Sequence, residues 1–332
     1  MRRLFLLIPV LIGVSLLTFT ITRMAGDPVN SYLSDPERAS ERQIQAVIDK
    51  YGLDEPQYIQ YLYWLKGVLQ GDLGYSQVAN LPVTDAIKLK FPATFEIAII
   101  ATIIAVVVGI AAGTKSAVKA NSALDQTTRV TSLVAVSIPV FWLGLMLLKV
   151  FYLDLGWAAP PDGRTSIMFA DVPTPTNFML IDSLIVGRPD MFWDALMHLA
   201  LPAITLAFAS TAIIIRMMRS SMLEVLGAEY VRTARSKGLP EKVVIKRHAR
   251  RNALIPTTTV VGLSFGGLLS GAVLTETIFN WPGMGRWAAD AAFNLDTAGI
   301  MGFTLLAAVI YTLANLTVDI MYAYLDPRVR LG

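Results

Sequence analysis

Six runs of apolar residues, each about as long as a membrane-spanning helix, divide the chain. A helix needs roughly 20 apolar residues to cross the hydrocarbon core, where every backbone polar group must be paired within the segment. The runs cover residues 4–22, 93–112, 130–153, 195–217, 255–279 and 299–322. They predict an all-α integral membrane protein with six transmembrane helices. The first run is too long for the apolar core of a cleaved signal peptide and lacks a clear cleavage site, so we favour a retained span over that alternative.

Basic and acidic residues divide unequally between the two sides of this arrangement. If the N-terminus lies inside, the inner segments hold 17 Lys and Arg against 5 acidic residues, and the outer segments hold 10 against 17. Because Lys and Arg are enriched in cytoplasmic loops, we expect both termini in the cytoplasm. The chain then consists of a first transmembrane helix (1–22), an extracytoplasmic segment (23–92) and a five-helix core (93–332) containing a cytoplasmic loop (218–254) and an extracytoplasmic loop (154–194).

Composition supports this class of protein. Hydrophobic residues make up 54% of the 332 residues, charged residues 16%, and the mean hydropathy is +0.55. Soluble proteins carry roughly 25% charged residues, so an ordinary soluble enzyme, a disordered chain and a coiled coil are excluded. The net charge of +3 is too small to indicate nucleic-acid binding. The chain has no cysteine, and its two histidines, His198 and His248, lie far apart, so we expect no metal site.

The two outer segments differ in pattern. After Asp54-Glu55-Pro56, residues Tyr58, Leu62, Leu65 and Leu69 recur on one face of a predicted helix, which Gly71-Asp72-Leu73-Gly74 ends. A loop of this length without a purpose is uncommon, so we favour an outer docking surface over a simple connector. The second outer loop, 154–194, shows no strong period and is predicted to be irregular.

The cytoplasmic stretch 216–256 has the most specific pattern. Leu223, Leu226, Tyr230, Val231 and Ala234 form one apolar stripe if the segment is a single helix. Gly238 is a natural left-handed stop, and Pro240 stands where a second, basic helix can begin and run into the fifth span. A basic loop resting on anionic lipid explains the charge. The fixed turn at Gly238 instead favours a helix to which a cytoplasmic protein binds, because adsorption to lipid needs no such turn.

One segment in this stretch resembles the "EAA" loop of ABC importer permeases, closest to the branch that serves oligopeptides, dipeptides and nickel. The segment is Glu229, Tyr230, Val231, Arg232, Thr233, Ala234, Arg235, Ser236, Lys237, Gly238 and Leu239. Arg232-Thr233-Ala234 replaces the usual Glu-Ala-Ala triplet, which narrows the resemblance to the peptide branch. Residues 71–76 and 276–285 are similar to the same family, and the resemblance covers nearly the whole chain outside 154–194.

The resemblance implies a type I permease fold in the cell membrane of a prokaryote, surrounded by membrane lipid. Its implied partners are a homologous permease, two cytoplasmic ATPases that hold the ATP and Mg, and an extracytoplasmic substrate-binding protein. Residues 229–239 then form the coupling helix, with Val231 and Ala234 facing the groove of an ATPase and Arg232 and Arg235 pairing with acidic residues there. The chain itself is expected to have no catalytic residues and to bind no cofactor or nucleic acid.

Other residues bear on the pathway and on helix packing. Glycine pairs 109/113, 262/266 and 267/271 have the small-xxx-small spacing of closely packed membrane helices. The ionisable residues Glu96, Lys149, Glu276 and Asp319 fall within or at the ends of spans, where we expect structural ion pairs rather than proton relays. Residues assigned to the translocation path are Ser137, Pro139, Ser264, Gly267 and Glu276.

These patterns leave alternatives for the function. Peptides are the predicted cargo, and the same permease architecture importing oligosaccharides or nickel is the first alternative. An ion-gradient-driven secondary transporter would use Glu96 or Asp319, but the chain shows no repeat of one half in the other. A membrane scaffold without a pore is the third alternative.

Overall fold

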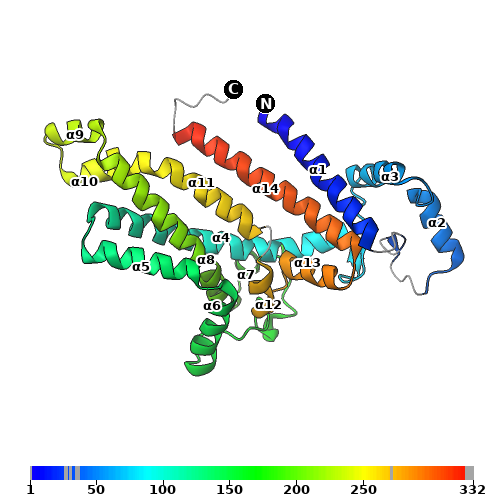
Figure 1. Cartoon of the computed structure of the whole chain (residues 1–332). Coiled ribbons are helices and arrows are strands. Elements are labelled where there is room, and N and C mark those ends of the chain that lie inside the picture. The colour runs from blue at the N-terminus through cyan, green and yellow to red at the C-terminus, as the bar shows by residue number, and fades with distance from the viewer. Residues whose placement is uncertain (1, 26–28, 30–31, 34–37, 270–271, 326–332) are drawn as a thin grey trace.

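The computed structural model describes residues 2–25, 29, 32–33, 38–269 and 272–325, and it is helical almost throughout (Figure 1). Its α-helices are α1 (Arg2–Ala25), α2 (Glu41–Tyr51), α3 (Gln57–Leu69), α4 (Val83–Val118), α5 (Ala123–Ser137), α6 (Val140–Leu147), α7 (Met179–Ile185), α8 (Pro189–Leu226), α9 (Glu229–Ser236), α10 (Glu241–Val243), α11 (Arg250–Leu269), α12 (Val273–Ile278), α13 (Met284–Phe293) and α14 (Thr297–Leu325). Two π-helices (Leu148–Asp154 and Val244–Ala249), a 3₁₀ turn (Ile167–Phe169) and one antiparallel pair of short strands, β1 (Tyr75–Ser76) and β2 (Leu81–Pro82), complete the described elements.

Four helical stretches within the described residues are long and apolar enough to cross a membrane: α4, α8, the continuous stretch from α10 through α11, and α14. The helices Ala123–Ser137 and Val140–Asp154 make a fifth span if the two are counted as one. Helix α1 contributes a shorter apolar stretch, Pro9–Met24. Two predicted spans are interrupted. The third bends by 101° at Ile138-Pro139, because proline cannot continue the hydrogen-bonding ladder. The fifth run, 255–279, is two helices, since α11 ends at Leu269 and α12 begins at Val273.

Helices α4 and α8 lie side by side because α4 presents a stripe of mostly small residues at every fourth position (Figure 1). The stripe consists of Ala93, Ile97, Ala101, Ala105, Gly109 and Gly113, all buried. It packs against Leu199, Ala203, Leu206, Ala207 and Ile214 of α8. Residues four apart occupy one helix face, and small side chains let two backbones approach closely. The glycine pair 109/113 therefore serves helix packing, as its spacing predicts.

Replacement of Gly113 by alanine should destabilise the protein. An added Cβ would lie 2.8 Å from the Ile215 carbonyl oxygen and from Met218 Cβ, so α8 would have to move. Overpacking of this kind costs about 1–3 kcal/mol of the free energy of unfolding. The matched control is Gly267→Ala on α11, where nothing lies within 4 Å of the added carbon. Thermal unfolding in detergent should show a lower Tm for Gly113→Ala alone, and equal Tm values would contradict this packing.

Helix α14 lies between α1 and α11 (Figure 1). A Cβ at Gly262 would meet Val318 of α14, and one at Gly266 would meet Ala314, so this pair also serves close packing. For the second predicted pair on α11, Gly267 faces open space and Gly271 lies outside the described residues.

Helix α3 begins after Pro56 and ends before Gly71, whose φ of 84° suits glycine, as predicted. Tyr58, Leu62 and Leu69 of the predicted apolar face are exposed, and the docking role of that face stays a prediction. The buried side is centred on Trp64, which packs against Phe19 of α1 and Met301 of α14.

Candidate functional site

The segment between α8 and α11 folds as a sharp elbow rather than as the single helix predicted from its apolar stripe. Helix α8 ends at Leu226, and Ala228 is extended, with φ −71° and ψ 146°. The Ala228 N–H donates to the Val225 carbonyl at 3.0 Å, which closes the turn into α9. Gly227 provides the break, because glycine is a weak helix former. Gly238 then stops α9 with φ 74°, as predicted.

Helix α9 turns its apolar side toward its own chain. Val231 is fully buried and Ala234 is 6% exposed, and both pack against Val244 in the π-helix that precedes α11. The prediction that these two residues face the groove of another protein is therefore wrong in this conformation. A short amphipathic helix must cover its apolar stripe somewhere, and α9 covers it against the start of the next helix.

Polar contacts fix α9 in this position. Arg235 donates two hydrogen bonds to Glu241, from Nη2 to Oε1 at 2.7 Å and from Nε to Oε2 at 3.1 Å. Asn252 of α11 donates to the Tyr230 hydroxyl at 2.8 Å. A bidentate Arg–carboxylate pair restrains orientation as well as distance. The elbow is therefore joined to the following helix at both ends of α9.

The exposed side of α9 carries mostly polar and charged groups, together with Tyr230, which is 43% exposed. Glu229, Arg232, Thr233, Ser236 and Lys237 are exposed, and Arg232 forms an ion pair with Glu229 at 2.9 Å. Beyond this helix, Gly238 and Leu239 are exposed as well. Such a surface has the donors and acceptors to bind a protein partner, and it offers no nucleophile–base pair for covalent chemistry.

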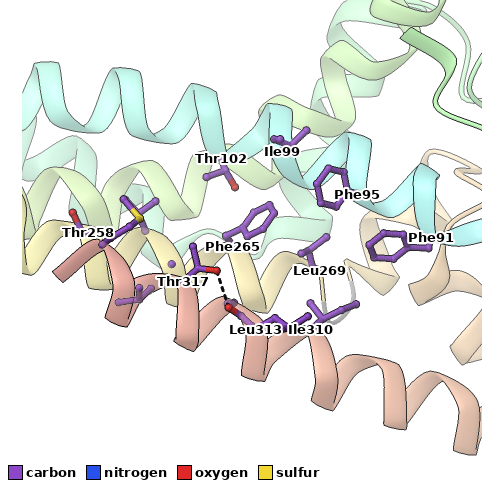
Figure 2. Close-up of a pocket in the computed structure, with 15 residues that line it drawn as sticks. Phe91, Phe95, Ile99, Thr102, Thr258, Phe265, Leu269, Ile310, Leu313 and Thr317 are labelled. Atoms are coloured by element: carbon purple, nitrogen blue, oxygen red, sulfur yellow. Dashed lines mark hydrogen bonds between the residues drawn. The ribbon is translucent and has the colours of Figure 1, made fainter. Parts of the chain in front are cut away.

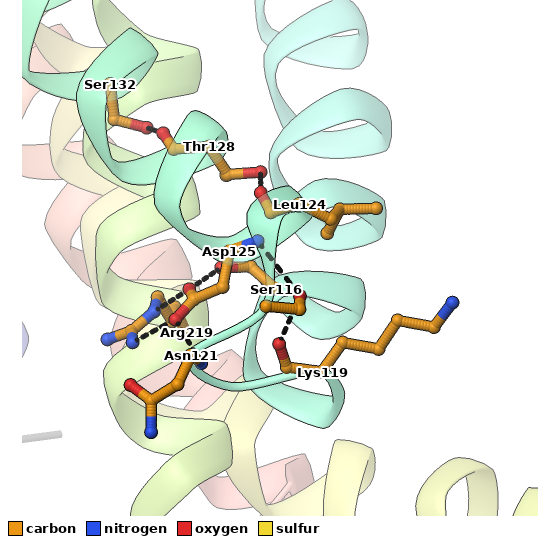
Figure 3. Close-up of polar contacts among 9 residues, drawn as sticks. Ser116, Lys119, Asn121, Leu124, Asp125, Thr128, Ser132 and Arg219 are labelled. Carbon is orange, nitrogen blue, oxygen red and sulfur yellow. Dashed lines mark hydrogen bonds and ion pairs between the residues drawn. The ribbon is translucent and has the colours of Figure 1, made fainter.

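A buried acidic residue behind the elbow escaped the sequence analysis. Asp125 at the start of α5 is fully buried and accepts hydrogen bonds from Arg219 of α8, Nε to Oδ1 at 2.6 Å and Nη2 to Oδ2 at 2.8 Å (Figure 3). Ser116 of α4 and the Asn121 N–H donate to the same carboxylate. The only signal in the sequence was one acid within a basic segment. The cluster ties the α4–α5 turn to α8, two turns before the elbow.

At the other end of the molecule, Glu276 forms a clasp between α12, α13 and α4. Its carboxylate is fully buried and accepts from Thr94 Oγ1 at 2.7 Å and from the Arg286 N–H at 2.8 Å. Trp281 Nε1 donates to the Ala93 carbonyl at 2.9 Å. A Cβ at Gly283 would lie 2.4 Å from the Glu276 carboxylate, which explains the glycine there.

Glu96 supports the loop 154–194. It pairs with Arg164 at 2.6 Å, and both side chains are 6% exposed. Its other oxygen accepts from the Leu180 N–H at 2.8 Å. The expectation of a structural ion pair is confirmed for Glu96, and Lys149 pairs with Asp154 at 2.7 Å on the surface. The side chain of Asp319 lies outside the described residues. Sequence reasoning missed Arg164 because nothing in the loop's pattern distinguishes it.

Loss of Arg164 should release this loop. Arg164→Gln leaves the Glu96 carboxylate with one donor, which costs about 1–3 kcal/mol of local stability. Limited proteolysis should then cut within 154–194 faster than in the parent protein. Arg188→Gln is the control, because its pair with Asp190 is on the surface and should leave cleavage unchanged. Equal cleavage of the two variants would contradict the anchoring role.

A cavity of about 420 Å³ lies between α4, α11 and α14 (Figure 2). Its lining is apolar, with Phe91, Phe95 and Phe265 prominent. The hydroxyls of Thr102, Thr258 and Thr317 lie there too, but each donates to a carbonyl of its own helix. The cavity therefore suits apolar groups, because it offers no free donor.

The five residues assigned to the pathway do not lie together in this cavity. Ser137 and Pro139 stand at the bend between α5 and α6, exposed. Ser264 and Gly267 are on α11 outside the cavity lining, and Glu276 is in the outer clasp. Their assignment to a translocation path stays a prediction.

A comparison with models of protein families shows the family of this chain. The model described as "Binding-protein-dependent transport system inner membrane component" matches residues 76–331, which include the elbow, the clasp and four of the membrane-length helices. This chain belongs to that family. As a member of this permease family it is a multi-pass inner-membrane transport component, not a catalytic enzyme.

Relatives of similar length agree with the permease family. The chain is 46% identical to the dipeptide transport system permease protein DppB of Escherichia coli (strain K12), over 99% of this chain and 98% of that protein. It is 45% identical to the di/tripeptide transport system permease protein DppB of Pseudomonas aeruginosa, over 99% and 97%. It is 39% identical to the oligopeptide transport system permease protein AppB of Bacillus subtilis, over 99% and 98%.

Proposed function

We propose that this chain is the permease subunit of an ATP-driven peptide importer. The full-length similarity to dipeptide, di/tripeptide and oligopeptide permeases supports peptides as the cargo. The chain would supply half of the translocation path, with six spans and both termini in the cytoplasm. A homologous permease would supply the other half.

The observation that carries the mechanism is the elbow at residues 227–239. Helix α9 is held to the π-helix by Val231 and Ala234 and to α10 by the Arg235–Glu241 pair, and it presents a mostly polar face outward. We infer that this face docks on a cytoplasmic ATPase, so that Glu229, Arg232, Thr233, Ser236 and Lys237 make the contact. Because α9 is joined to both α8 and α11, displacement of α9 would move both helices.

The cycle follows from two conformations biased by partners. Two ATPase subunits would bind ATP and Mg, and their closure would favour the outward-facing state. An extracytoplasmic substrate-binding protein would deliver the peptide, and ATP hydrolysis would reset the permease. Residues of this chain position helices and line the path. They perform no covalent step.

Reconstitution tests this function. Proteoliposomes that contain this chain, its partner permease and the ATPases should take up a labelled dipeptide only with ATP and a peptide-loaded binding protein. Uptake by this chain alone, driven by an ion gradient, would contradict the proposal and favour a secondary transporter. A cognate binding protein that holds only an oligosaccharide or nickel would reject peptides as the cargo.

A further inference from the structure

Five cationic side chains surround one open hollow at the beginning of the helix that leads into α11. The hollow encloses about 550 Å³, and its lining consists of Lys242, Val243, Lys246, Arg247, Arg250 and Arg251. It lies on the side that we propose to be cytoplasmic, and its lining residues belong to α10, the π-helix and α11. None of them is among the residues of α9 that we propose to dock on an ATPase.

None of these five cations forms an ion pair with a carboxylate in the described part of the chain. The nearest acidic residue in the sequence, Glu241, is engaged by Arg235. On α9, by contrast, Arg232 and Arg235 both have acidic partners within the chain. Unneutralised charge of one sign in one place repels itself and attracts a polyvalent anion.

The π-helix Val244–Ala249 gathers these charges on one side. Hydrogen bonds in a π-helix join residues five apart, so residues five apart lie nearly one above the other. Val244 and Ala249 are five apart and both fully buried against the bundle. Lys242 and Arg247, and likewise Lys246 and Arg251, have the same spacing and lie on the hollow. An α-helix would spread these residues more widely around its axis.

The position along the helix indicates the kind of anion. The stretch Glu241–Leu269 is continuous and apolar enough to cross a membrane, and the cations occupy its first turns. In the membrane orientation that we propose, they lie at the level of lipid headgroups, where long basic side chains reach along the interface. Arginine forks match phosphate oxygens. We propose that this basic hollow binds the phosphate of an anionic membrane phospholipid.

Native mass spectrometry of the assembled transporter with added phosphatidylglycerol tests this site. In a variant with Lys246, Arg247, Arg250 and Arg251 each changed to Gln, retention of phosphatidylglycerol should fall at least tenfold, since each basic residue contributes roughly fivefold in affinity. The matched control changes the exposed Lys115, Lys119, Arg129 and Arg216 to Gln, which removes the same charge elsewhere and should leave retention unchanged. The charge-preserving variant Lys246→Arg should retain the lipid.

Three outcomes would overturn the proposal. Equal loss in the test and control variants would mean attraction by total charge alone. Displacement of phosphatidylglycerol by an equal concentration of inorganic phosphate would mean a site for free phosphate. Loss of the ATPase subunits with unchanged lipid retention would mean that the hollow is a protein contact. None of these results bears on ATP-dependent peptide uptake. The proposed lipid site can therefore be rejected while the proposed transport function stands.

Discussion

A Gly238→Val variant of the assembled transporter is expected to hydrolyse ATP while its peptide uptake falls at least tenfold. Gly238 has φ 74°, and nothing lies within 4 Å of an added Cβ, so the effect is on the backbone rather than on packing. The left-handed conformation costs a non-glycine residue about 1–2 kcal/mol, with β-branched residues among the least tolerant. The turn should open, which changes the angle between α9 and the helix that follows.

Gly238→Asn is the matched control for this prediction. Asparagine tolerates the left-handed region, so uptake should stay close to that of the parent protein. Simultaneous measurement of ATP hydrolysis and labelled dipeptide uptake in proteoliposomes separates uncoupling from loss of assembly. Normal uptake by a fully assembled Gly238→Val complex would contradict the role of the turn in coupling.

The second large effect is expected at the buried pair behind the elbow. Arg219→Met removes both guanidinium hydrogen bonds from Asp125 and leaves a buried carboxylate with Ser116 and a backbone N–H as donors. Removing one partner of a buried pair costs about 3–5 kcal/mol. We expect roughly 3 kcal/mol of unfolding free energy, at the lower end of that range, because some donors remain.

Thermal unfolding in detergent measures this loss as a fall in Tm of several degrees. Arg216→Met on the same helix is the control, because Arg216 is exposed and has no ion pair among the described residues, and it should leave Tm unchanged. The double variant Arg219→Met with Asp125→Asn should recover part of the loss, since no charge is then left buried. A Tm equal to that of Arg216→Met would contradict the structural role of the pair.

The site also shows how sequence patterns mislead locally. Five apolar residues of 223–234 form one helical stripe, yet Gly227 and Ala228 divide them between two helices. A stripe records which side chains are covered but not which surface covers them. Val231 and Ala234 are therefore identified from the sequence as buried, while only the structure places them against Val244.

Local chemistry along the chain determined the helical class, the apolar runs, the stop at Gly238 and the close packing of glycine-bearing helices. These properties depend on neighbouring residues, and so the sequence alone suffices to predict them. The tertiary structure decided the ion pair of Glu96 with Arg164 and that of Asp125 with Arg219. The members of each pair are 68 and 94 positions apart in the chain, so no local pattern could join them. A buried charge is costly unless it has a partner, and only the packing of whole helices determines which partner is within reach.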